Sequence, residues 1–176
     1  MSFYEGQFPA PNESTGYHGI LKRWWETYGL GEICIIVGEG MESRDFFIKL
    51  FPNVKFITVD VSAKVKPDFI WDICKEIPID LKKFRNKIGS VLCQAVIEHI
   101  VDPVNAIRNF SILLKSDGFI YLHGSGVKFP EHRYPCDCLR FLEDWFRMLP
   151  DYLPSIKLID LKNDTNENIF AVYQKI

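Results

Sequence analysis

The chain has 176 residues, 47% of them hydrophobic and 14% aromatic, which is enough to bury the core of one domain. Its 21 basic and 23 acidic residues are mixed along the chain and give a net charge of −2, which excludes the basic footprint of a nucleic-acid-binding surface. No apolar run has the length of a membrane span, and the first residues lack a signal peptide's apolar core, so we expect a cytoplasmic protein without a membrane partner.

The first predicted elements are an irregular arm and a helix. Residues 1–17 contain Pro9 and Pro11 between aromatic residues, a composition typical of irregular backbone. Residues 18–28 carry apolar side chains at helical spacing, and Gly29 favours the end of that helix.

The next stretch is an apolar run that ends in a glycine turn. Residues 33–37 are rich in β-branched side chains and predict a strand buried on both faces, as in a parallel sheet. Gly38 and Gly40 follow, and residues 42–51 have helical spacing before Pro52. Strand, glycine turn and helix form the first half of a nucleotide-binding unit, although tight turns also carry such glycines for geometry alone.

The remaining residues alternate strands and helices. Residues 55–60 and 67–72 predict strands that end on Asp60 and Asp72, and Asp102 with Pro103 predicts a helix start. The other predicted elements are a loop with a surface helix at 73–87, strands at 90–93 and 119–123, a loop at 124–140, a helix near 142–149, and a strand pair at 155–161 and 169–174. The pattern predicts one α/β domain over residues 1–176, with a mostly parallel sheet closed by an antiparallel hairpin.

The predicted ligand follows from the carboxylates at the strand ends. Asp60 comes about twenty residues after the glycines, where a carboxylate accepts hydrogen bonds from a ribose; the alternative is that it only caps its strand. Glu39 and Glu42 in the turn would repel the pyrophosphate of a dinucleotide. A ligand with a ribose, an adenine, a cationic centre and no phosphate suits the turn better, and S-adenosylmethionine has those features.

Residues 29–141 resemble the class I S-adenosylmethionine-dependent methyltransferases, in particular the small type 11 bacterial domain. The matching segments are the glycine turn at 36–40, Val59-Asp60, the segment 70–78 around Asp72, and the stretch 91–103 with the turn at 114–118. The resemblance implies a three-layer Rossmann-like methyltransferase fold. The cofactor site that it implies consists of Gly38, Glu39, Gly40, Glu42, Asp60, Val61, Asp72, Ile73 and Gln94.

Two positions depart from the family's pattern. Ile36 and Val37 stand where an acidic residue is common, and Glu42 replaces a third glycine. Both changes fall beside the methionine half of the cofactor, where Glu42 either crowds the ligand or accepts a hydrogen bond from its amino group.

The loop at 124–140 resembles the substrate loop of the same subgroup and supplies the predicted catalytic residues. His132 is a candidate general base oriented by Asp137, and Arg140 is a candidate anchor for an anionic group. The alternative is that Asp137 and Arg140 pair with each other and brace the loop, which leaves His132 exposed. His99 is expected to bind backbone near Asp102, and Glu98 is expected to brace the loop rather than to act as a base.

No metal site is predicted. Among His123, His132, Cys136 and Cys138, the Cys-x-Cys spacing differs from a Cys-x-x-Cys zinc knuckle, and the chain has no second such pair. We therefore expect methyl transfer from S-adenosylmethionine to a small molecule or a carbohydrate. The alternatives are a degenerate, non-catalytic binding module, which Ile36 and Glu42 favour, and a nicotinamide dehydrogenase, which the acidic turn disfavours.

Overall fold

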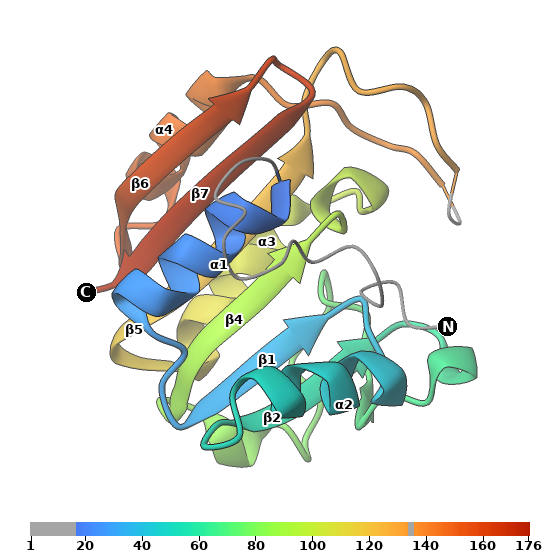
Figure 1. Ribbon diagram of the computed structural model, residues 1–176, viewed down its shortest axis with the longest axis vertical. Coiled ribbons are helices and arrows are strands. Elements are labelled where there is room, and N and C mark those ends of the chain that lie inside the picture. The colour runs from blue at the N-terminus through green and yellow to red at the C-terminus, as the bar shows by residue number, and fades with distance from the viewer. Residues whose placement is uncertain (1–16, 134–135) are drawn as a thin grey trace.

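The computed structural model describes residues 17–133 and 136–176 (Figure 1). Within these residues, seven strands form one sheet in the order β3-β2-β1-β4-β5-β7-β6. The strands are β1 (Ile33–Val37), β2 (Lys55–Asp60), β3 (Phe69–Ile70), β4 (Ile88–Gln94), β5 (Leu114–Ser125), β6 (Ile156–Asp164) and β7 (Asn168–Lys175). The first five run parallel, and β7 lies antiparallel to both β5 and β6. The predicted parallel sheet with a closing hairpin is confirmed.

Helices cover both faces of the sheet (Figure 1). They are α1 (Tyr17–Tyr28), α2 (Met41–Leu50), α3 (Pro103–Leu113) and α4 (Glu143–Tyr152), with short 3₁₀ turns η1 (Ala63–Val65), η2 (Lys82–Phe84) and η3 (Ile97–His99). One apolar layer joins α1 and α2 to the sheet, and a larger one joins α3 and α4 to its other face. The predicted arm, apart from Tyr17, lies outside the described residues.

Local capping explains the accurate start of α3. The Asp102 side chain accepts a hydrogen bond from the Asn105 backbone N–H at 3.0 Å, and Pro103 occupies the first turn.

Strands β1, β2, β3 and β4 run parallel, so their carboxyl ends meet at one edge of the sheet. This is the edge where ligands bind in open α/β folds.

The surface helix predicted within residues 73–87 is wrong, because only η2 forms there. Asn109 of α3 donates from its amide to the carbonyls of Ile73 at 2.9 Å and Lys75 at 2.8 Å, and Trp71 donates to the Glu76 carbonyl at 3.1 Å. Side chains thus occupy the carbonyls that a helix would need. No helix in the described ranges is both long and apolar enough to cross a bilayer.

Candidate active site

Backbone hydrogen bonds bring the glycine turn and both predicted acids to one edge of the sheet. The Gly38 N–H donates to the Val59 carbonyl at 2.8 Å, which places the turn beside the end of β2. The Trp71 N–H donates to the Asp60 carbonyl at 2.9 Å, which places Asp72 directly after the same edge.

Both acids cap their own strand ends and retain acceptor capacity. Asp60 Oδ1 accepts from the Ser62 N–H at 2.5 Å, and its Oδ2 has no hydrogen bond to residues 17–133 or 136–176. Asp72 Oδ1 accepts from the Cys74 N–H at 3.1 Å, and its Oδ2 lies 3.6 Å from Lys75 Nζ. A carboxylate oxygen has two lone pairs, so strand capping and ribose binding are compatible at Asp60.

Contacts within the chain itself explain why glycine stands at positions 38 and 40. Gly38 has a φ of +78°, and a Cβ there would lie 2.6 Å from Val96 Cγ2. Gly40 has an extended backbone, and a Cβ there would lie 1.7 Å from the carbonyl oxygen of Val65. Turn η1 therefore packs directly on Gly40. At both positions, the absence of a Cβ leaves room for other atoms of this chain.

The other predicted cofactor residues occupy different environments. Glu39 accepts from the Ser43 hydroxyl at 2.5 Å, and Glu42 is exposed in the first turn of α2. Three predicted cofactor residues remain. Gln94 is buried at the end of β4, and Ile73 is buried in the core. The side chain of Val61 is 65% exposed. The Ile73 side chain packs in the core beneath that edge.

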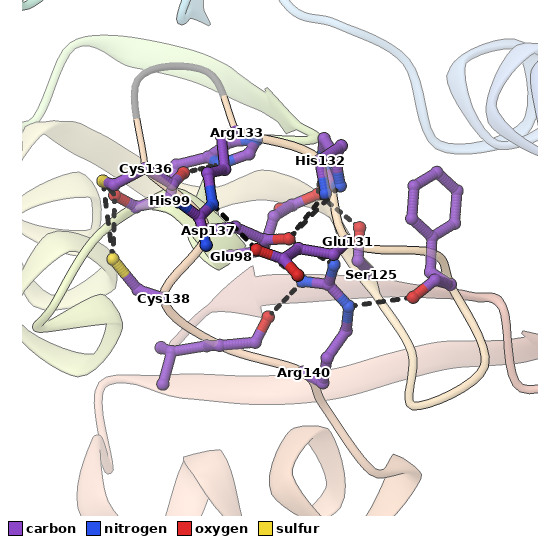
Figure 2. A network of polar contacts seen from close by, with 12 residues as sticks. Glu98, His99, Ser125, Glu131, His132, Arg133, Cys136, Asp137, Cys138 and Arg140 are labelled. Carbon is purple, nitrogen blue, oxygen red and sulfur yellow. Dashed lines mark hydrogen bonds and ion pairs between the residues drawn. The ribbon is translucent and has the colours of Figure 1, made fainter.

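The predicted catalytic loop is held together by an ion pair (Figure 2). The Arg140 guanidinium binds both carboxylate oxygens of Asp137, which holds the pKa of Asp137 well below its usual range. Arg140 also donates to the carbonyls of Phe129 at 3.1 Å and Pro130 at 2.9 Å. This arrangement is the bracing alternative, because the loop itself uses the guanidinium donors.

His132 lies between two carboxylates, those of Asp137 and Glu98. Its backbone N–H donates to Asp137 Oδ2 at 2.8 Å, and its ring Nδ1 lies 3.7 Å from the same oxygen. The side chain is 34% exposed, and its Nε2 lies 3.9 Å from Oε1 of Glu98. The ion pair of Asp137 and Arg140 thus leaves His132 packed against a second carboxylate rather than exposed.

Sequence reasoning gave Glu98 only a bracing role. Its backbone carbonyl does brace the loop, accepting from Cys138 N–H at 2.8 Å and Leu139 N–H at 3.0 Å. Its side chain is fully buried, with Oε1 accepting from the Ser125 hydroxyl at 2.6 Å. The signal in the sequence was a carboxylate directly after the apolar stretch Ala95-Val96-Ile97, a pattern that places a charge at the edge of a core.

The hydrogen-bond partners of His99 and His123 were not predicted from the sequence. His99 Nδ1 lies 2.5 Å from the Cys136 carbonyl oxygen, so His99 binds the loop rather than backbone near Asp102. His123 Nδ1 accepts from the Ala95 N–H at 3.1 Å, and its Nε2 lies 3.0 Å from Asn168 Oδ1. His123 is therefore separate from the group formed by Glu98, His99 and His132.

No family model matches the sequence, and no curated protein matches it either. The structure is similar to many solved structures of methyltransferases. One is the Burkholderia thailandensis 1,6-didemethyltoxoflavin-N1-methyltransferase with bound 1,6-didemethyltoxoflavin and S-adenosylhomocysteine, with a TM-score of 0.65, 12% identity, and 88% of this chain and 75% of that chain covered.

Two further matches belong to different organisms. An S-adenosylmethionine-dependent methyltransferase from Archaeoglobus fulgidus gives a TM-score of 0.63 and 13% identity over 91% of this chain and 95% of that one. A variant of the 16S rRNA (adenine(1408)-N(1))-methyltransferase from Catenulisporales acidiphilia gives 0.62 and 11% over 88% and 90%. Together with the strand order, these similarities show that the chain has the fold of the class I S-adenosylmethionine-dependent methyltransferases.

Proposed function

We propose that the chain transfers a methyl group from S-adenosylmethionine to a small-molecule or carbohydrate acceptor. The observation that carries the proposal is the position of Asp60, at the carboxyl end of β2 and beside the glycine turn, where its Oδ2 accepts no hydrogen bond from the described residues. A ribose of the cofactor would donate its hydroxyl protons to that carboxylate. Asp72, which follows β3, would accept a hydrogen bond from the adenine amino group.

The residues fit the adenosine half of the cofactor better than its methionine half. Asp60 and Asp72 supply acceptors for the ribose and the base. Beside the turn, the Val65 carbonyl lies against Gly40, so the methionine half needs η1 to move away from that glycine. The cofactor supplies the methyl group as a sulfonium; the chain's residues only bind it and orient the acceptor.

The loop at 126–141 would hold the acceptor. Asp137 and Arg140 act there as positioning residues, because their contacts are with each other and with loop carbonyls. His132 is the candidate general base, since its ring Nε2 is directed away from the ion pair.

A specific observation favours the second candidate, a non-catalytic binding module. Val65 and Val96 take up the space above the two glycines, as expected of a turn that no longer admits a cofactor. The same fold would then serve for binding alone.

Calorimetry separates the candidates. The purified full chain should bind S-adenosylmethionine or S-adenosylhomocysteine and not NAD. Asp60→Ala should weaken that binding roughly tenfold or more, because a hydrogen bond to a charged group contributes about 1.5–3 kcal/mol. Asp151→Ala, an exposed change on α4, is the control and should leave the affinity unchanged. NAD binding alone would reject the proposal, and absence of binding to all three ligands would favour the module.

A further inference from the structure

We propose that Glu98, His99 and His132 form a binding site for a divalent transition-metal ion. One ligand atom from each of these residues lies within 4.8 Å of the other two. Turn η3 supplies Glu98 and His99, and the loop after β5 supplies His132 (Figure 2). Two imidazoles and one carboxylate are a donor set that suits zinc and neighbouring first-row metals.

The burial of the Glu98 carboxylate gives a second reason. Glu98 is 0% exposed, and its Oε1 is used by the Ser125 hydroxyl. Its Oε2 is also buried and has no hydrogen-bond partner among residues 17–133 and 136–176. A buried carboxylate oxygen without a partner is costly, and a bound cation would compensate that cost.

The hydrogen bonds of both imidazoles favour the same tautomer, with the proton on Nδ1. His99 Nδ1 lies 2.5 Å from the Cys136 carbonyl oxygen, and His132 Nδ1 lies 3.3 Å from the Pro130 carbonyl oxygen. A carbonyl only accepts, so each Nδ1 carries the proton and each Nε2 keeps its lone pair. Metal-binding histidines are oriented in this way, with the second ring nitrogen donating to a carbonyl or carboxylate.

The nearby charges allow a cation. Asp137 lies on the other side of the His132 ring, with its Oδ2 3.7 Å from Nδ1. The positive charge of Arg140 is already neutralised by its ion pair with Asp137. The competing explanation is a protonated His132 that pairs with Glu98 across 3.9 Å without any metal.

Two cysteines on the same loop require a control. Cys136 Sγ lies 3.1 Å from the His99 carbonyl oxygen, and the Cys136 and Cys138 sulfurs are 3.5 Å apart. Both cysteines are exposed, so they could capture zinc independently of the three proposed ligands.

While an ion is bound, His132 cannot serve as a general base. The roles of His132 as a metal ligand and as a general base are therefore mutually exclusive.

The test titrates the metal-free full chain with Zn²⁺ by calorimetry and records the visible spectrum with Co²⁺. We expect one equivalent to bind, with d–d bands and without a thiolate charge-transfer band. Glu98→Gln and His132→Ala should each weaken binding at least about tenfold, the loss typical of changes around a metal ligand. Cys136→Ser/Cys138→Ser should bind within about twofold of the wild type, since its change leaves the N and O donors intact.

Three results would overturn the site: no binding by the wild type, unchanged affinity in His132→Ala, or binding that depends on the cysteine pair. Circular dichroism and thermal unfolding check each variant. His132 is partly exposed, so His132→Ala keeps the test decisive even if the buried change at Glu98 unfolds the chain. Methyl transfer is not part of the readout, so failure of the site and failure of the proposed function are distinguishable.

Discussion

A serine–glutamate hydrogen bond is present both at the glycine turn after β1 and at the loop around Glu98, but the surroundings of the two glutamates differ. In the turn, Ser43 donates to Glu39 at 2.5 Å, and the chain's own valines lie over the glycines. At the loop, Ser125 donates to Glu98 at 2.6 Å, and the second Glu98 oxygen is buried without a hydrogen-bond partner in the described part of the chain. Packing thus fills the space beside the glycines of the turn, while the loop keeps a buried acceptor without a partner among the described residues.

The largest expected effect is at Gly40. In Gly40→Ala the new Cβ would overlap the Val65 carbonyl, so η1 must move, and we expect the free energy of unfolding to fall by about 3 kcal/mol, as in overpacked sites. Gly29→Ala is the matched control: its φ is +81°, but no atom of the described residues lies within 4 Å of an added Cβ, so only the left-handed strain of about 1–2 kcal/mol applies. Urea denaturation measures both. Wild-type stability in Gly40→Ala would mean that η1 leaves the turn open, and the contrast between the regions would disappear.

The fold was predictable because local signals agreed with it. The β-branched run 33–37, the cap at Asp102 and the polar connection before β7 each predict an element without reference to distant residues. The site was predictable only in part, because its geometry depends on contacts far apart in the sequence. Nothing local shows that Val65 would lie on Gly40, or that His132 would reach Glu98. Likewise, the helix expected at 73–87 failed because Asn109 binds the carbonyls from another element.

A second comparison removes each serine hydroxyl. Ser125→Ala should lower the free energy of unfolding by about 1–3 kcal/mol, because Glu98 would then lose its buried donor. Ser43→Ala should cost less, about 0.5–1.5 kcal/mol, because Glu39 is partly exposed and water can replace the hydroxyl. Equal losses from the two variants, measured by thermal and urea unfolding, would show that burial does not distinguish the two pairs. A bound metal at Glu98 should reduce the Ser125→Ala loss.

The smallest expected effect is a pH dependence confined to the loop. Arg140 holds the pKa of Asp137 below its usual range, so this pair's stabilisation is present above the unfolded carboxyl pKa of about 3.9 and is lost as pH falls through the folded value. Asp137→Asn should therefore be less stable than the wild type at pH 7, and the gap should narrow below about pH 4. The glycine turn is held by packing, so its side of the molecule should show no such change.

Amide hydrogen exchange localises that effect. Below pH 4 the Cys138 and Leu139 amides, which donate to the Glu98 carbonyl, should lose protection in the wild type before the Gly38 amide, which donates to the Val59 carbonyl. In Asp137→Asn the two loop amides should already be less protected at pH 7 and should change little on acidification. If the loop and Gly38 lost protection together, the ion pair would be stabilising the whole domain rather than the loop, because only global unfolding exposes both regions at once.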